Sequence, residues 1–389
     1  MAGNGVAWNP LRCTGTALPP QILLMAKLIA LCLLLTNHVR LLPEPFLSFI
    51  PILDDIPGPL FQSTVRTVFI VSALALLFNR SVRLSCTVLG LTILVAVVSS
   101  KVYYGNNKLF TGLMLLLSGL MKPGQDPWLL RYQFALVYFG AGLNKLLDPD
   151  WHSGQFFEHW ATARLKNDLY IQASAMLPPL VLAKAMCWVT IVTELALVPM
   201  ILVRRLNSLA IWLNVLFQTS LMFFTGMTFV MFFYSMTAAS LILATWPRRQ
   251  GVEVFFDGDC GICRKIKRLF ERFDYDRLFV WIPYQTGGAL QYGITMEAAQ
   301  QRLQLVEDKR TYNGFGAFKI MLLRYPATYF VIALLLAGPP DSYANYRRAG
   351  ALLIIAFFFP LFSRVGDAVY DLVARNRRKL TPGSTCNVD

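Results

Sequence analysis

Charged residues and histidine are both scarce in this sequence. Of its 389 residues, 15% are charged and 56% are hydrophobic. Roughly a quarter of the residues of a soluble domain are charged, so this balance excludes an ordinary soluble protein and predicts a polytopic membrane protein. The three histidines and seven cysteines are scattered, apart from one C-x-x-C pair. A disulfide framework is therefore not indicated.

Acidic residues are also few, which leaves a net charge of +14 from 36 basic and 22 acidic side chains. An excess of this size is compatible with nucleic-acid binding. Here, however, the lysines and arginines cluster at the ends of apolar segments and in the last third of the chain. Cytosolic loops beside anionic lipid have this pattern. The predicted partner is therefore the lipid bilayer, and nucleic acid is not expected.

Long apolar segments fill the first two thirds of the chain. Because roughly 20 residues cross the hydrocarbon core, we predict about eight transmembrane helices, at residues 22–41, 60–78, 84–103, 108–121, 128–147, 180–203, 206–224 and 226–246. The apolar pattern ends where Pro247 and two arginines follow Trp246. We therefore divide the chain into a lead-in (1–21), a helical membrane domain (22–246) and a C-terminal domain (247–389).

Lysine and arginine in the short loops indicate the orientation, because cytosolic loops carry the excess of positive charge. A cytosolic N-terminus places most of them inside: Arg80, Arg83, Lys122, Arg204, Arg205, Arg248 and Arg249. An even number of crossings then makes the C-terminal domain cytosolic as well, and we assign the protein to the plasma membrane. A reducing compartment fits a catalytic dithiol better than a structural disulfide.

The most compact chemical motif begins the C-terminal domain. Residues 252–256 are an apolar run that predicts a buried strand, and Asp257-Gly258 predicts a turn. Asp259 is the expected cap of the next helix, whose first turn holds Cys260 and Cys263. Two cysteines at this spacing lie near enough for a disulfide, and a helix N-terminus favours the thiolate. This order of elements is typical of a thioredoxin-like redox site.

Further motifs extend the pattern: Trp281-Ile282-Pro283-Tyr284-Gln285, Gly314-x-Gly316-Ala317, Tyr370-Asp371-x-x-Ala374-x-Asn376-Arg377 and Cys386. With Asp257-Gly258-Asp259-Cys260-x-x-Cys263 they resemble the DCC family of predicted thiol-disulfide oxidoreductases over residues 250–389. The resemblance implies a thioredoxin-like fold, with Cys260 as attacking thiol and Cys263 as resolving thiol. Asp257 and Asp259 would support them, and a thiol-containing protein or small molecule would be the redox partner. One departure is that no proline precedes the strand predicted at 302–307, where thioredoxin-like sites place a cis-proline.

Three other interpretations of this motif stay open. A zinc site needs about four nitrogen or sulfur ligands. After residue 250, however, the sequence has only one cysteine besides Cys260 and Cys263, namely Cys386, and it has no histidine. Asp257 and Asp259 also resemble the nucleophile pair of haloacid dehalogenase-like phosphatases, although Gly261 stands where threonine or valine is expected. Thirdly, the two cysteines are inert and structural. We predict no metal.

The rest of the C-terminal domain is predicted as an alternation of strands and helices. A strand at 277–282, a helix at 295–301, a hairpin of 302–307 with 310–313 and a helix at 315–323 give an α/β order that suits a thioredoxin-like sheet. Residues 328–337 and 349–362 are apolar but shorter than a membrane span. We expect helices packed on the domain with some membrane contact; the alternatives are a surface that docks against the membrane domain and a shallow hairpin in the bilayer. A tail helix is predicted at 365–375.

A second motif lies in the predicted membrane domain, between Gln133 and Gly154. The stretch 132–160 resembles the HTTM superfamily, whose best-known members are the vitamin K-dependent γ-carboxylases. The resemblance implies that Lys145 is the base that deprotonates a hydroquinone. The carboxylases also use a histidine well upstream of this lysine, and His38, the only one upstream here, has no matching context. Glutamate carboxylation is therefore not predicted.

Physical chemistry supports Lys145 independently of the resemblance. A desolvated lysine near the end of an apolar helix can act as a base, and ionisable groups at membrane depth are usually functional. The alternative is a snorkelling ammonium group that pairs with Asp148 or Asp150. Glu194 lies in another apolar helix, where we expect a structural contact between helices, a place in the same pocket or a bridge to Lys184.

The sequence thus leads to one main hypothesis and one alternative. The main hypothesis is an integral membrane redox protein whose C-x-x-C module exchanges electrons with a quinone-like ligand in the helical bundle. The alternative is a non-enzymatic membrane protein that binds a lipid or a partner and carries a structural C-terminal domain. Replacement of Cys260 and Cys263 distinguishes the two, since only the first requires both thiols.

Overall fold

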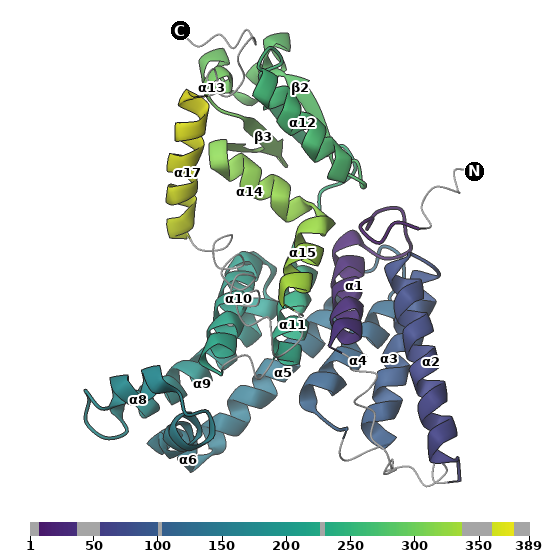
Figure 1. Ribbon diagram of the computed structural model, residues 1–389, viewed down its shortest axis with the longest axis vertical. Helices are drawn as coiled ribbons and strands as arrows, with labels where there is room; N and C mark the ends of the chain where they lie inside the picture. Colours follow the sequence, from purple (N-terminus) through teal and green to yellow (C-terminus); the bar gives the residue numbers. More distant parts are fainter. Residues whose placement is uncertain (1–7, 37–54, 100–102, 226–229, 337–359, 377–389) are drawn as a thin grey trace. The chain divides into compact units, whose positions relative to one another are not determined.

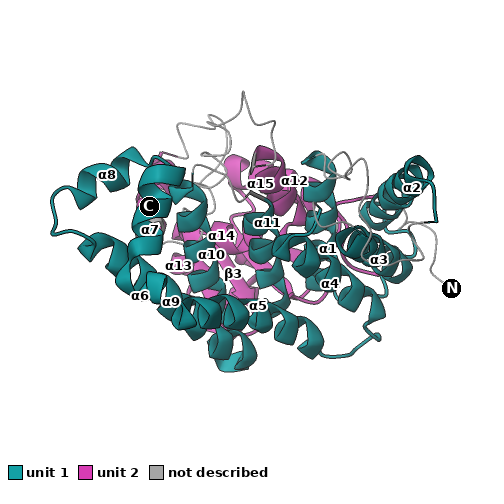
Figure 2. Ribbon diagram, turned by 90° about the horizontal axis from the view of Figure 1, so that it is seen from below, with its two compact units in different colours: residues 1–8, 16–244, 337–343 teal, residues 9–15, 245–336, 344–389 magenta. Residues whose placement is uncertain are grey.

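The computed structural model describes residues 8–36, 55–99, 103–225, 230–336 and 360–376. These residues form two compact units (Figure 2). The first unit holds Trp8 and the described residues between 16 and 244. The second holds residues 9–15 and the described residues from 245 onward.

The first unit is entirely helical. Its longer helices are α1 (Pro20–Leu35), α2 (Gly58–Leu77), α3 (Val82–Ser99), α4 (Asn106–Leu120), α5 (Trp128–Leu147), α9 (Val181–Leu202), α10 (Asn207–Phe224) and α11 (Val230–Ala239). Short helices connect them: α6 (Pro149–Ser153), α7 (Gln155–His159), η3 (Trp160–Arg164), α8 (Asp168–Ser174), η4 (Arg204–Leu206) and η5 (Ser240–Leu243). Helices therefore occur at every position where a span was predicted.

The prediction of eight membrane spans is supported only in part. Among the described residues, four helices are long and apolar enough to cross a bilayer: α2, α3, α9 and the continuous stretch Arg204–Phe224. A fifth is reached if α14 (Gly314–Arg324) and α15 (Pro326–Leu336) count as one span, bent by 79°. The others fall short for physical reasons: α1 and α11 are short, α4 has 15 residues, and α5 carries Arg131 and Lys145.

Helices α5 and α9 approach each other closely in the first unit. Gly142 of α5 is buried, and a Cβ atom there would lie 2.8 Å from the Leu195 side chain and 3.3 Å from Cβ of Glu194. Small residues permit such close contact between apolar helices. The glycine therefore brings the carboxylate-bearing segment of α9 against α5.

Four strands form one sheet in the second unit: β1 (Val252–Phe256), β2 (Phe279–Pro283), β3 (Gln304–Glu307) and β4 (Arg310–Asn313). Their order in the sheet is β2-β1-β3-β4. Strand β1 is parallel to β2 and antiparallel to β3, which is antiparallel to β4. A parallel pair needs a crossover connection, and α12 (Gly261–Phe273) lies within it. Phe256 is paired with Pro283, so the loops that leave β1 and β2 are neighbours.

Both faces of the sheet are covered, which explains why β1 is apolar at every position except Glu253. Val252, Val254 and Phe256 pack with side chains from α12 and α14, including Phe270, Ala317 and Met321. Phe255 points to the other face, against Ala289 of η7 (Gly288–Tyr292) and Ala299 of α13 (Met296–Gln301). Figure 1 shows α12 and α14 beside the strands, and α17 (Pro360–Arg375, yellow), which packs against α14.

The predicted order of strands and helices after residue 250 is confirmed, with boundaries shifted by about two residues. The apolar segment predicted at 328–337 contributes to α15, and the predicted tail helix is part of α17. Residues 349–359, like Cys386, lie outside the described residues.

Part of the predicted N-terminal lead-in is structured. Residues 9–15 belong to the second unit, where buried Asp276 holds them. Its carboxylate accepts hydrogen bonds from the backbone nitrogen of Cys13, at 3.0 Å, and from the backbone nitrogen and hydroxyl of Thr14, both at 2.8 Å. A buried carboxylate with several donors is well satisfied, so this contact fixes the segment.

Candidate functional site

The turn after β1 is organised by Asp257 rather than by Asp259. The Asp257 side chain is buried, and its Oδ1 accepts hydrogen bonds from the backbone nitrogens of Asp259, at 3.0 Å, and Cys260, at 3.3 Å. Cys260 itself is the N-cap residue of α12, and no side chain caps that helix. The expectation that Asp259 caps the helix is therefore wrong, because Asp257 already binds the first backbone donors of the turn.

Gln285 links the two carboxylates. Its Nε2 donates to Oδ1 of Asp257 at 2.9 Å and to Oδ2 of Asp259 at 3.2 Å. Its Oε1 accepts from the backbone nitrogen of Gly258 at 3.2 Å. The pairing of β1 with β2 places Gln285, in η6 (Tyr284–Thr286), beside this turn. Gln285 was not predicted as a site residue, and its position just after β2, within the Trp281–Gln285 motif, was the available signal.

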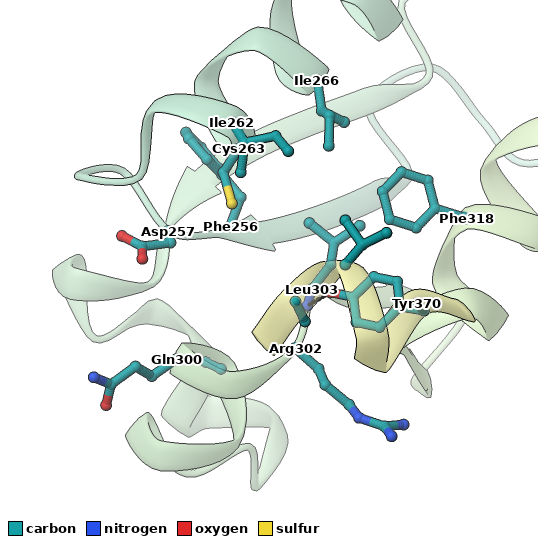
Figure 3. A pocket seen from close by; sticks show the side chains of 13 residues that line it. Phe256, Asp257, Ile262, Cys263, Ile266, Gln300, Arg302, Leu303, Phe318 and Tyr370 are labelled. Carbon is teal, nitrogen blue, oxygen red and sulfur yellow. Dashed lines mark hydrogen bonds between the residues drawn. The ribbon is translucent and has the colours of Figure 1, made fainter. Parts of the chain in front are cut away.

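The two cysteines differ in their surroundings. Cys260 has 0% of its surface exposed, whereas Cys263, one turn into α12, is partly exposed. Cys263 lines a cavity of about 60 Å³. Figure 3 shows its sulfur atom directed into the space between Phe256 and Leu303. The structure thus brings both predicted cysteines and Asp257 together at one end of β1.

The cavity wall is mostly apolar. Its lining residues come from β1, α12, α13, α14 and α17: Phe256, Ile262, Ile266, Leu303, Phe318, Tyr370, Val373 and Ala374, with Asp257, Ala299, Gln300 and Arg302 completing it beside Cys263. In Figure 3 the Arg302 side chain extends away from Cys263. The sulfur of Cys263 therefore faces hydrocarbon more than charge.

Helix α17 closes one side of this cavity through two polar contacts. Nη2 of Arg302 lies 2.5 Å from Oδ2 of Asp371, with Asp367 at 3.7 Å from Nη1. The backbone nitrogen of Leu303 donates to the Tyr370 hydroxyl at 2.9 Å. Leu303 precedes β3, so α17 occupies a backbone donor close to the cysteines. This role of the tail helix was not predicted from the sequence.

Lys145, the candidate residue of the first unit, is held in an ion pair. Its Nζ lies 2.8 and 2.9 Å from the two carboxylate oxygens of Glu194 on α9, and 5.1 Å from the centre of the Trp151 ring. Glu194 is buried. The expected interhelical contact of Glu194 is confirmed, but its partner is Lys145 and not Lys184. Asp148 instead caps α6, through the backbone nitrogen of Asp150.

Polar side chains recur every seven residues along α5, on the face that carries Lys145. Arg131 donates to the carbonyl of Ile201, and the Tyr138 hydroxyl is hydrogen-bonded to Asn214. Gln218 donates to that hydroxyl at 2.8 Å. Arg131 and Tyr138 were not predicted as site residues, although Arg131, Tyr138 and Lys145 are spaced seven residues apart in the sequence. They form a buried polar row between α5 and its neighbours α9 and α10.

Among the residues that the structure describes, no group of three or more His, Cys, Asp or Glu side chains could hold a metal ion.

Two family models match the chain. The HTTM domain model matches residues 122–246, which include Lys145 and Glu194. The DCC1-like thiol-disulfide oxidoreductase model matches residues 254–346, which include Cys260 and Cys263. Both resemblances inferred from the sequence are thereby confirmed, although α17 lies beyond the second match. No curated protein and no solved structure matches the chain.

Proposed function

We propose that this chain, with its HTTM domain and its DCC1-like thiol-disulfide oxidoreductase domain, is a membrane-bound enzyme that exchanges two electrons through Cys260 and Cys263. One observation carries the proposal: both cysteines begin the helix that follows β1, inside the oxidoreductase match, and Cys263 borders a cavity. In the reduced state the pair gives two electrons to a disulfide or another oxidant and closes as a disulfide.

The fold of the second unit supports this chemistry. We propose that it is a thioredoxin-like domain, because β1 and β2 are parallel, β3 and β4 are antiparallel to their neighbours, and α12 follows β1 directly. In that arrangement the N-terminus of α12 lies close to both sulfur atoms. The partial positive charge of a helix N-terminus favours a thiolate, the species that attacks disulfides.

The proposal is tested by a redox titration of the full chain in detergent, read by alkylation and mass spectrometry of the peptide that contains both cysteines. We expect one two-electron transition, roughly between −120 and −270 mV, as in known dithiol proteins. The variant Cys187→Ser is the matched control, because Cys187 is buried in the first unit. If the pair never closes, the second unit is structural, and the non-enzymatic alternative is correct.

The membrane assignment contains a finer proposal. The described helices of the first unit include four candidate spans, and we place the N-terminus and the second unit in the cytosol, with the plasma membrane as location. The distribution of lysine and arginine in the short loops supports this orientation. Labelling of single engineered cysteines in intact cells by an impermeant maleimide tests it. Labelling of the second unit without permeabilisation contradicts it.

A quinone-like ligand in the HTTM domain remains part of the proposal. Lys145, Glu194 and Trp151 are the residues that would meet it, because they join a charged pair to an aromatic ring within the helical unit. Two electrons and two protons from the Cys260/Cys263 dithiol would convert the quinone into a quinol. We expect Lys145→Met to slow oxidation of the dithiol by an added quinone while its oxidation by a soluble disulfide is unchanged.

A further inference from the structure

The two sulfur atoms of the C-x-x-C pair are not equally accessible. Cys260 is completely buried, while Cys263 is partly exposed and lines the cavity between α12 and α17. A sulfur atom of a substrate can reach a thiolate only along an open path. The cavity provides such a path to Cys263. Cys260 is completely buried, so a substrate has no comparable path to its sulfur atom.

The cavity also restricts the chemistry of the substrate. Its walls are formed chiefly by Phe256, Ile262, Ile266, Leu303, Phe318 and Val373. The charged residues that border it are already engaged, since Asp257 accepts from the turn and Arg302 pairs with Asp371. A charged substrate would lose its hydration here without gaining a counter-ion, which is costly. A volume of about 60 Å³ holds roughly four water-sized spheres, which suits a short aliphatic group.

From this geometry we infer that Cys263 is the sulfur that meets the substrate, that Cys260 resolves the intermediate, and that the substrate is a disulfide with an uncharged, apolar group beside its sulfur. This order reverses the roles that the family resemblance implies. The inference rests on the proposed function, because it requires that the pair exchange thiols at all.

The reaction balances without a further reactant. The Cys263 thiolate attacks one sulfur of the substrate R–S–S–R, the substrate disulfide breaks, and the first R–S⁻ leaves. Cys260 then attacks the Cys263 sulfur of the mixed disulfide, the second R–S⁻ leaves, and the Cys260–Cys263 disulfide forms. Two electrons pass from the dithiol to the substrate, and the two thiol protons end on the two released thiols.

The experiment uses the reduced full chain in detergent and three methanethiosulfonate reagents of similar length. One carries a butyl group, one a sulfonatoethyl group and one a trimethylammonioethyl group. Mass spectrometry after rapid quenching gives the modification rate of each cysteine. We expect Cys263 to react first, and about tenfold faster with the butyl reagent than with either charged reagent, because an unpaired charge is disfavoured in the cavity. In Cys263→Ser, Cys260 should react about tenfold more slowly than Cys263 does in the wild type, because it is buried.

Two further variants test the cavity and the resolving step. Ala374→Phe fills the cavity and should slow the butyl reagent, whereas Val369→Phe, on the same helix but 55% exposed, should not. In Cys260→Ser the butyl mixed disulfide on Cys263 should persist, whereas the wild type should release butanethiol and close the pair.

The outcomes separate the inference from the proposed function. If the wild-type pair closes but Cys260 is modified first, the assignment of Cys263 is wrong while the oxidoreductase stands. If Cys263 reacts equally with charged and butyl reagents, the apolar substrate class is wrong. If the pair does not close with any reagent, the proposed function fails, and the inference fails with it.

Discussion

Nε2 of Gln285 lies 2.9 Å from Oδ1 of Asp257, the oxygen that also accepts from the backbone nitrogen of Cys260. One carboxamide thereby sets the position of the turn in front of the reactive pair. The same Nε2 group also donates to Asp259, so the carboxylates of Asp257 and Asp259 share one donor. Gln285 acts on the chemistry only through these neighbours, so it is a positioning residue.

We predict that Gln285→Ala slows disulfide exchange about tenfold and lowers the free energy of unfolding by about 1–3 kcal/mol, because the buried Asp257 carboxylate loses one of its donors. Gln285→Glu adds a third carboxylate, so its exchange rate should fall as the pH rises through the range where carboxyl groups ionise. Rate profiles from pH 4 to 9 check both variants. Thr286→Ala, in the same short helix, is the control, because the Thr286 hydroxyl donates to the carbonyl of Pro283. Equal pH profiles for the wild type and Gln285→Glu would contradict the positioning role.

The ion pair between Arg302 and Asp371 should control access to Cys263. Both side chains are about one third exposed, so the pair itself contributes no more than about 1 kcal/mol. Arg302→Glu adds repulsion toward Asp371 and Asp367, and we expect α17 to loosen and Cys263 to react about two- to tenfold faster with an uncharged maleimide. The double variant Arg302→Glu/Asp371→Arg restores opposite charges and should restore the slow rate. If the double variant stays fast, the effect does not arise from the pairing.

Asp276 should be essential for the order of residues 9–15. It accepts four hydrogen-bond contacts from Cys13 and Thr14 while itself 3% exposed. Asp276→Ala leaves these donors unsatisfied, and we expect a loss of about 3 kcal/mol of local stability. Hydrogen exchange at Thr14 measures it directly. Thr14→Ala removes the hydroxyl contact alone and should produce a much smaller loss.

Burial raises the pKa of Asp274 above its ordinary value of 3.8, even though backbone nitrogens of Leu278 and Phe279 donate to it. The folded state therefore binds the proton more tightly than the unfolded state. The stabilising effect of that proton is complete below pH 3.8 and is lost as the pH rises through the folded-state pKa. We expect the backbone amide hydrogen of Leu278 to exchange faster with solvent as the pH rises from 3.8 through the folded-state pKa of Asp274. The Asp274→Asn variant should show no such change in the exchange rate over the same pH range. A carboxyl carbon titration that places the Asp274 pKa below 3.8 would contradict the argument.

Local patterns were enough to predict much of the second unit. The largely apolar run of β1, the turn at Asp257-Gly258 and the helix that begins at the two cysteines depend on residues close in sequence, and each was found where it was expected. The cover supplied by α17 was not predicted, because it depends on Arg302 and Asp371, which are 69 residues apart. Contacts over such distances leave no periodic signal in a single sequence.

The first unit shows the same limit in another form. The positions of the helices were predicted from the long apolar segments of the sequence. Composition alone does not show how far each helix continues or which charged groups pair inside the bundle. For Glu194 we predicted a structural contact between helices, a place in the same pocket or a bridge to Lys184, but not the partner itself, since nothing in its own helix indicates a residue 49 positions away. The close approach at Gly142 selects Lys145, and that approach is a property of packing.

The buried ion pair of Lys145 and Glu194 can be compared with an exposed ion pair in the same unit, to test how much each contributes to stability. Because 20% and 9% of the two side chains are exposed, removal of one partner leaves a largely buried charge. We expect Lys145→Met or Glu194→Gln alone to destabilise the bundle, by about 3–5 kcal/mol for Lys145→Met, and the double variant to recover most of that loss.

Arg204 and Asp126 also pair, at 2.7 Å, but their side chains are 71% and 46% exposed. Asp126→Asn should therefore change stability little. Thermal unfolding in detergent compares all four variants. If the double variant is as unstable as Lys145→Met, the lysine contributes through more than its charge, and its contact with the Trp151 ring becomes the next residue pair to vary.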